Sequence, residues 1–484
     1  MSSSSLLDVS ALADSVSCRV IVPGDSDYDS ARAGFNGMID KRPAAIVLIA
    51  SDADAAAAIA FARQHDLPLA IRSGGHSAPG HGCCDDGIVI DCRDLQLAEV
   101  DDKTNTVRVG SGLTWKQFDA ATQAHGLAVT GGRVSSTGVT GLTIGSGSGW
   151  LERAMGLTSD SLIGARVVTA AGVSLDTDDD PELLWALRGG GGNFGVVTEL
   201  RFQLRRLGPT VHGGKRFYPI ERGVEVLSAF RDVMMAAPKE LCGGLAFLTA
   251  PPAPWVPEGV RGKAVVAIIV VWAGDPNEGT AAMAKLEALG EPLVDHIGQV
   301  DYAELQQVMD PGAPAGHRDY FKGGFMHNLS DEAVREIVAL GEDMRAPLTQ
   351  IICAPLGAHT TYATVGEDHS AIGHRDEEWS FQVLSLWADA AQDAEQKGWT
   401  RAAAERMSSY SDMVSYPNFL TADEAADVEA AYSPTAMARL RAVKDRLDPD
   451  NVFRINNNIA PSGSLTRGDV PPAAGSPDSY AVSA

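Results

Sequence analysis

The most distinctive stretch of the chain is TGGRVSSTGVTGLTIGSGSGW, residues 130–150. Seven of its 21 residues are glycine, and most of the others are small. So little side-chain volume lets a planar ring system lie flat against the main chain, whose N–H groups can then bind a ring edge and a pyrophosphate. We therefore expect this stretch to form one wall of a site for a flat, phosphorylated ligand.

A second glycine motif is RSGGHS, residues 72–77, which follows an expected strand at residues 68–71. Consecutive small residues can point successive backbone N–H groups into one concavity, which binds phosphate without basic side chains. The glycines alone favour an ordinary tight loop. His76 favours a cofactor site instead, because a histidine beside a cofactor can be a ligand, a base or a covalent attachment point.

A third motif, GGGNFG at residues 190–195, has the spacing of a dinucleotide-binding fingerprint. In that fold the glycines follow a strand and open a helix. Here they follow an expected helix at residues 181–187 and open an expected strand at residues 196–204. The reversed order argues against a Rossmann nicotinamide site.

The chain has 484 residues, with 39 Lys+Arg against 63 Asp+Glu and a net charge of −24. Average usage of about 7% would give roughly 34 glycines. The chain has 50, of which 18 fall in residues 110–195 and five in residues 74–87. The acidic balance argues against nucleic acid and anionic membrane as partners, since phosphate neutralisation needs clustered Lys and Arg.

The first eight residues, MSSSSLLD, lack the basic and apolar segments of a signal peptide, and no apolar run approaches the roughly 18 residues of a membrane span. We therefore predict a cytoplasmic protein. Six cysteines, scattered except for Cys83-Cys84, form no metal-spaced set and no dense disulfide framework. We expect six reduced thiols and no metal site.

Apolar runs and turn signals predict an α+β fold. In the first part, a buried strand at residues 44–50 precedes a helix that Ser51 caps and that ends at His65. From residue 209 onward, long strands alternate with amphipathic helices, which predicts an antiparallel sheet with helices on one face. These strands and helices are expected at residues 264–272, 280–289, 331–340 and 380–387.

Several separated motifs, taken in order, resemble one protein family. They are the loop 72–77, the stretch 131–150, GLTSD at 156–160, VVTAAG at 167–172, LWALRGGGGNFGVVT at 184–198, YAELQ at 302–306, YFK at 320–322 and DPDNVFRINNNI at 448–459. Together these motifs look like the berberine-bridge-enzyme-like branch of the vanillyl-alcohol-oxidase flavoproteins. The resemblance covers roughly residues 20–461.

The resemblance implies a two-domain enzyme with a PCMH-type FAD-binding fold. Residues 1–208 would form the FAD domain, with its core at about 38–208, and residues 209–410 the substrate domain. Residues 411–461 would return to the FAD domain. Residues 462–484, rich in Ser, Pro, Gly and Ala, are expected to be a disordered tail.

The resemblance also implies which residues bind FAD. His76 matches the histidine that relatives link covalently to the flavin 8α-methyl group, and a neutral imidazole nitrogen can add to that carbon in the flavin's quinone-methide tautomer. The expected FAD-binding residues are Arg72, Ser73, Gly74, Gly75, His76, Ser77, Gly132, Thr137, Gly138, Gly141, Leu142, Gly145, Val196, Tyr416, Asn418, Asn456 and Asn458.

The chain departs from the family pattern at two positions. Val134 replaces a cysteine that forms a second flavin link in many relatives, so we predict a single histidyl link and a lower flavin potential. Phe419 replaces a tyrosine base, so the base lies elsewhere or is not needed. The polar catalytic candidates are Tyr320, Lys322, His374 and Tyr416, although for each of them taken alone the sequence favours a structural role over a catalytic one. Alternate residues of the strand 380–387 would face the flavin ring.

The expected activity is that of an oxidase, in which a small substrate gives a hydride to FAD and O2 reoxidises the flavin to yield H2O2. The missing cysteine argues against a sugar and favours an aromatic or heterocyclic natural product or amine. A sugar or secondary-alcohol oxidase, a flavin dehydrogenase or oxygenase, and a flavin-free phosphate-binding module remain alternatives. We expect a monomer or small homo-oligomer.

Overall fold

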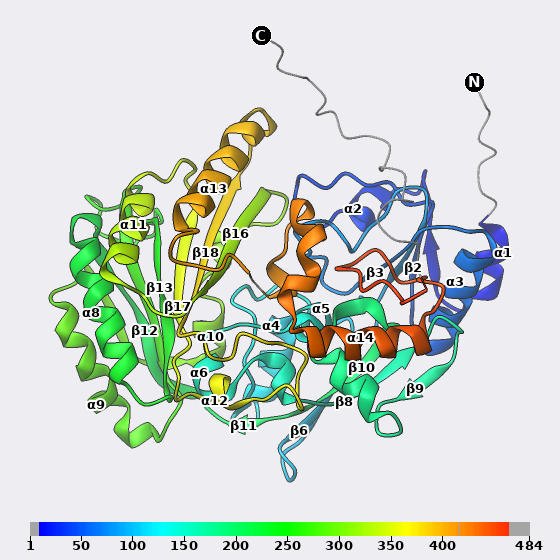
Figure 1. Cartoon of the computed structure of the whole chain (residues 1–484), viewed down its shortest axis with the longest axis horizontal. Helices are drawn as coiled ribbons and strands as arrows, with labels where there is room; N and C mark the ends of the chain where they lie inside the picture. The colour runs from blue at the N-terminus through cyan, green and yellow to red at the C-terminus, as the bar shows by residue number, and fades with distance from the viewer. Residues whose placement is uncertain (1–8, 415, 464–484) are drawn as a thin grey trace.

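A computed structural model describes residues 9–414 and 416–463 of the chain. Figure 1 shows two halves side by side: one large sheet backed by helices, and a second half with smaller sheets and the α14 helix, Pro434–Leu447. The predicted α+β class is confirmed. No helix of the described residues is long and apolar enough to cross a membrane.

The first sheet has the strand order β1-β2-β4-β3, parallel except for β1. Its strands are Arg19–Ile21, Ala45–Leu48, Leu69–Arg72 (β3) and Ile88–Asp91 (β4). The α3 helix, Asp52–Gln64, begins where Ser51 accepts a hydrogen bond from the Asp54 N–H, as predicted from the sequence. The β3 strand ends at Arg72 and delivers the chain into the RSGGHS loop.

A five-stranded antiparallel sheet, ordered β5-β6-β10-β8-β9, completes this half together with the short pair β11-β7. Its strands are Ala98–Asp101, Thr106–Gly110, Leu162–Val168 (β8), Ser174–Asp176 (β9) and Val196–Gln203 (β10), and the short pair is Leu127–Ala128 and Arg205–Arg206. The β10 strand follows the GGGNFG motif, which confirms the reversed order expected there.

The glycine-rich stretch contains the short α5 helix, Val139–Gly145. Glycine disfavours helix, but Val139 and Ile144 pack into the core of this half and hold the turn in place. The other helices here are α1 Ser10–Ser15, α2 Tyr28–Arg32, α4 Trp115–Gln123, α6 Glu152–Met155 and α7 Pro181–Leu187, with 3-10 turns at Thr158–Ser161 and Gly191–Asn193.

The large sheet is antiparallel throughout, with seven strands ordered β15-β12-β14-β13-β17-β18-β16. From β12 to β18 its strands are Thr210–Pro219, Leu241–Thr249, Ala264–Trp272, Val294–Asp301, Arg318–Met326 (β16), Gln350–Pro355 (β17) and Trp379–Trp387 (β18). Figure 1 shows α8, α11 and α13 along its outer side.

Alternation along each strand separates the two faces of this sheet. Ile351, Phe381 and Val383 join the core under the helices, whereas Gln382 and Leu384 point the other way. The helices are α8 Gly223–Ala236, α9 Gly279–Ala284, α10 Tyr302–Gln306, α11 Asp331–Glu342, α12 Thr361–Thr364 and α13 Asp393–Met407. The predicted helix 280–289 instead becomes α9 followed by a 3-10 segment, Lys285–Leu289, a common ending for a helix.

The α14 helix lies against α7 of the first half. Its Lys444 is fully buried and donates to the Asp448 carboxylate at 2.7 Å and to the carbonyls of Asn193 and Phe453 at 3.0 Å. Of the predicted tail at residues 462–484, all but Ser462 and Gly463 lies outside the described residues. Lys444 thus ties the last folded segment to the GGGNFG turn.

Replacing Lys444 with Met should destabilise the protein by about 3–5 kcal/mol, because it leaves the Asp448 carboxylate buried without its cation. Two measurements check this: the midpoint of thermal unfolding, and the susceptibility of the C-terminal segment to protease.

The control is Arg446→Met on the same helix. Arg446 is half exposed and pairs with Asp180 at the surface, so its loss should cost at most about 1 kcal/mol. Equal destabilisation by the two variants would contradict the role given to Lys444.

Candidate active site

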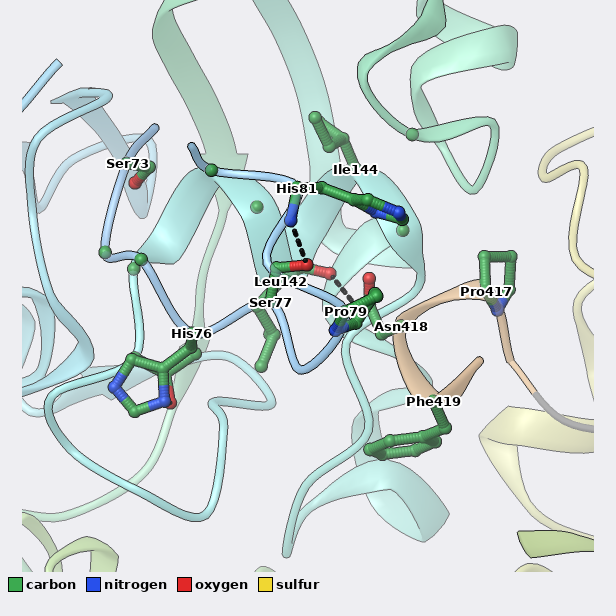
Figure 2. A pocket seen from close by; sticks show the side chains of 18 of the residues that line it. Ser73, His76, Ser77, Pro79, His81, Leu142, Ile144, Pro417, Asn418 and Phe419 are labelled. Carbon is green, nitrogen blue, oxygen red and sulfur yellow. Dashed lines mark hydrogen bonds between the residues drawn. The ribbon is translucent and has the colours of Figure 1, made fainter. Parts of the chain in front are cut away.

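A cavity of about 380 Å³ lies between the RSGGHS loop, the α5 region and the inner face of the large sheet. Its wall also includes the GGGNFG turn and two segments near the C-terminus, 417–420 and 453–457. Figure 2 shows His76, Ser77 and Pro79 on one loop beside Leu142 and Ile144 of α5, with Asn418 and Phe419 approaching from the C-terminal segment. Residues far apart in sequence thus meet around one space.

The RSGGHS loop packs backbone to backbone against Gly138. A Cβ at Gly74 would lie 2.2 Å from the Gly138 nitrogen, so neither position has room for a side chain. Gly75 has φ +71°, a conformation that favours glycine. Arg72 is turned toward β4, where its Nε donates to the Asp91 carboxylate at 2.7 Å, so it holds the loop rather than offering a free charge.

His76 lies against Phe35 with ring centroids 4.0 Å apart and an interplanar angle of 22°. Its Nε2 is 2.9 Å from the Ser136 hydroxyl, and its Nδ1 is 3.3 Å from the Thr137 hydroxyl. Desolvation in the cavity lowers the pKa of His76 to about 4. At neutral pH the imidazole is therefore uncharged, and one of its ring nitrogens keeps a lone pair.

The cavity fits a flavin dinucleotide on three observations. A Cβ at Gly141 would meet no protein atom within 4 Å, so the wall there is open main chain. Asn418 donates to the Leu142 carbonyl at 2.8 Å and so joins the C-terminal segment to α5. The Asn456 side-chain oxygen is buried without a hydrogen-bond partner among the described residues, as expected of a group that serves a ligand.

Most of the predicted FAD-binding residues line this cavity. They are Arg72, Ser73, Gly74, Gly75, His76, Ser77, Thr137, Gly138, Gly141, Leu142, Gly145, Asn418 and Asn456. Four others lie outside the described lining: Gly132, Val196, Tyr416 and Asn458. Val196 illustrates the reason, because it packs into the core beneath β4 while its strand neighbour Val197 reaches the cavity.

Tyr320 and Lys322, two of the predicted catalytic side chains, point away from the cavity. They alternate along β16 with Asp319 and Phe321, which line it. The Tyr320 hydroxyl donates to the Asp423 carboxylate at 2.6 Å, and Lys322 donates to the same carboxylate at 3.3 Å. The structure therefore places them in a polar cluster on the opposite face of the strand.

His374 and Tyr416 are also absent from the described cavity lining. His374 stacks on Phe325 and pairs with Asp412 at 3.6 Å. Together with Asp412 and Glu377 it forms a group whose ligand-type atoms lie within 4.8 Å of one another, and none of the three residues is part of the described cavity lining. Tyr416 packs edge-on against Phe325, and burial raises the pKa of its phenol well above the ordinary value.

The inner face of the large sheet contributes residues that sequence reasoning did not single out. They are Asp319 and Phe321 of β16, Gln350 and Ile352 of β17, and Gln382, Leu384 and Leu386 of β18. The three β18 residues are alternate positions, in agreement with the expected alternation of that strand. The turn glycines Gly190, Gly191 and Gly192 also line the cavity. The GGGNFG motif was the sequence signal that could have identified them as cavity residues.

Comparison with known proteins identifies the cofactor. Residues 43–178 match the family profile described as FAD binding domain, and residues 415–460 match the profile described as berberine and berberine like. The chain therefore contains the FAD-binding and berberine-like domains of an FAD oxidoreductase. The resemblance drawn from the sequence motifs is thus confirmed, and FAD is its cofactor.

Relatives match this oxidoreductase over nearly its whole length. An FAD-linked oxidoreductase of Dictyostelium discoideum is 29% identical and covers 94% of this chain and 97% of its own. The (R)-6-hydroxynicotine oxidase of Paenarthrobacter nicotinovorans is also 29% identical, over 93% of this chain and 98% of its own.

Solved structures share the fold of this oxidoreductase. The 6-hydroxy-D-nicotine oxidase of Arthrobacter nicotinovorans has a TM-score of 0.81 at 24% identity and covers 95% of this chain and 99% of its own. Berberine bridge enzyme from Eschscholzia californica has a TM-score of 0.82 at 20% identity, over 94% of this chain and 99% of its own.

Replacing Gly141 with Ala should separate folding from cofactor binding. Gly141 lies in α5, where alanine is favoured over glycine by up to about 1 kcal/mol, so the thermal stability of cofactor-free protein should be unchanged or higher. The methyl group would occupy open cavity space, so the FAD content per chain, read from flavin absorbance, should fall.

Gly366→Ala is the control, because a Cβ there also meets no atom within 4 Å but lies outside the cavity lining. Its FAD content should equal that of the wild type. Equal flavin contents in both variants would show that the open wall at Gly141 does not face the cofactor.

Proposed function

We propose that this oxidoreductase is an O2-dependent oxidase whose FAD is attached through a single covalent bond from His76. The observation that carries the attachment is the uncharged imidazole of His76, which lines the cavity and is oriented by Ser136 and Thr137. A protonated imidazole would have no lone pair for bond formation, and burial prevents that protonation at neutral pH.

The covalent step balances with O2 as the oxidant. A ring nitrogen of His76 would form the bond to the flavin 8α-carbon, with loss of the imidazole N–H and of one methyl C–H bond. The two electrons and two protons released pass to O2 and give H2O2. Val134, at the position where relatives have a second linking cysteine, lines the cavity with an aliphatic side chain that cannot form such a bond.

The substrate we propose is a small aromatic or heterocyclic natural product or amine. Phe321 and Phe419 stand edge to face at the cavity wall, with ring centroids 6.0 Å apart, and Leu384 lies beside Phe321 across the strand pair. Apolar and aromatic surfaces of this kind bind flat apolar molecules, and the Gln350 and Gln382 amides can orient a polar substituent.

When bound, the flavin would supply the hydride acceptor for an activated C–H bond of the substrate and the route for its electrons to O2. The chain's contribution is to position the substrate against the ring and to exclude water with the apolar wall. We further propose that the enzyme works in the cytoplasm as a monomer or small homo-oligomer. In the division we propose, residues 1–208 and 411–461 form the FAD domain and residues 209–410 the substrate domain, and the substrate binds between the two.

The His76→Ala variant tests the covalent bond. Wild-type protein precipitated with acid should give a yellow pellet, whereas the variant should release its FAD into the supernatant. The control is His81→Ala, because His81 also lines the cavity and burial likewise lowers its pKa to about 4. The His81 variant should keep a yellow pellet. A yellow His76→Ala pellet would place the bond elsewhere.

The oxidase activity is tested with a panel of aromatic amines, phenols, alcohols and sugars. We expect rapid H2O2 release in air and little reduction of an added dye when air is excluded. Rapid dye reduction with slow H2O2 release would instead identify a dehydrogenase. Purified protein without flavin absorbance would refute the cofactor assignment and every step built on it.

A further inference from the structure

Asp319 is the one acidic side chain among the described residues that line the cavity. It lies on β16 opposite Leu386 of β18, on the same face as Phe321. The residue is therefore part of the wall that the inner face of the large sheet presents to the space where the substrate would lie. None of the motifs that indicate FAD binding includes it.

Among the residues that the structure describes, none forms an ion pair or a hydrogen bond with the Asp319 carboxyl. Its Oδ1 is buried without a hydrogen bond among the described residues, and the residue is 8% exposed. The neighbouring Arg318 pairs with Asp393 instead. Burying an acceptor without a donor costs folding free energy. A ligand that donates a hydrogen bond to the Asp319 carboxyl would offset this cost.

The strand at Asp319 is fixed relative to the cofactor loop. The Asn36 side chain donates to the Asp319 carbonyl at 2.9 Å and accepts from the Asp319 N–H at 3.1 Å. The same amide donates to the Ala78 carbonyl, two residues beyond His76, at 2.9 Å. One side chain thus sets the position of the Asp319 backbone against the loop that would hold the flavin.

Burial raises the pKa of Asp319 from 3.8 to about 7. The charged groups around the cavity do not offset this effect, because Arg72 is paired with Asp91 and Arg133 with Glu152, while His76 and His81 are uncharged. Since the folded-state pKa is raised, the carboxyl is protonated below about pH 7 and becomes a proton acceptor above it. A general base is most effective when its pKa lies near the working pH.

We propose that Asp319 is the catalytic base, taking the proton from the N–H or O–H group bonded to the carbon that is oxidised. The inference rests on the proposed oxidase function. It narrows the substrate to a small, largely apolar amine or alcohol in which the oxidised carbon carries a protic nitrogen or oxygen.

The step balances without a further reactant. The substrate C–H hydrogen leaves with its electron pair as the hydride, the X–H proton moves to the Asp319 carboxylate, and the X–H electron pair forms the C=X bond. The resulting carboxylic acid returns its proton to solvent. The other polar groups on this face, the Gln350 and Gln382 amides, cannot accept the proton, and His81, with a pKa near 4, is a weaker base.

Asp319→Asn tests the proposal, since asparagine keeps the shape of the side chain and removes its basicity. We expect unchanged FAD content and a 10²- to 10⁴-fold slower anaerobic reduction of the flavin, the range for loss of a general base. In the wild type, the rate of flavin reduction should rise with pH through about 7. In the variant, this rising limb of the pH profile should be absent.

The matched control is Asp119→Asn. Asp119 is likewise buried with its pKa raised to about 7, but it lies on α4 beside Gln306 and outside the cavity lining. Its variant should keep the wild-type rate and pH profile. If both variants lose the rising limb, or if Asp319→Asn keeps it, the proposal is overturned.

Two further measurements separate this inference from the oxidase function. Infrared difference spectra of substrate-free holoenzyme between pH 6 and pH 8 should contain a carboxylic acid C=O band that Asp319→Asn removes and Asp119→Asn leaves in place. If Asp319→Asn leaves every such band unchanged, Asp319 is not a group that titrates in this range and the proposal fails. Benzylamine and benzyl alcohol, tried with the active members of the substrate panel, distinguish amine from alcohol substrates. Activity confined to compounds without an N–H or O–H on the oxidised carbon overturns the base while leaving the oxidase intact.

Discussion

The contact of the Gly74 backbone with that of Gly138 determines the rest of the site. Two segments more than 60 residues apart touch without intervening side chains, so the loop after β3 is held against the start of α5. That contact brings the imidazole of His76 to the hydroxyls of Ser136 and Thr137. A side chain at either glycine would separate the loop from the helix and displace the imidazole from both of its partners.

The large sheet supplies the opposite wall, and its contribution depends on the alternation of residues along each strand. One face of β16, β17 and β18 packs under the helices, and the other face lines the cavity with apolar, amide and carboxyl groups. Because adjacent residues on a strand point to opposite faces, the chemistry of the wall depends on the register of each strand. The Asn36 amide, bonded to both β16 and the loop near His76, sets this register relative to the cofactor site.

Most of the cofactor side of the cavity could be predicted from the sequence, because the sequence signals for it are local. The glycines at 74 and 138 allow close approach of main chain, the glycine at 141 leaves the cavity wall open, and the Ser51 cap and the strand before RSGGHS need no distant partner. The substrate wall was less predictable. The polar side chains of Tyr320 and Lys322 make both residues catalytic candidates in the sequence. In the structure, β16 turns both toward Asp423, and the neighbouring Asp319 lines the cavity instead. Which face of a strand is inward depends on packing between segments distant in sequence, which a single sequence does not reveal.

The cavity wall includes Ile455, Asn456 and Asn457, which follow the last helix of the described fold. During synthesis the ribosome releases the N-terminal segments first, and domains generally fold as units in that order. The RSGGHS loop, α5 and the large sheet can therefore fold while this side of the cavity is still missing. The cofactor can find its complete site only when almost all of the described chain has been translated, so flavin incorporation is a late event in the maturation of this enzyme.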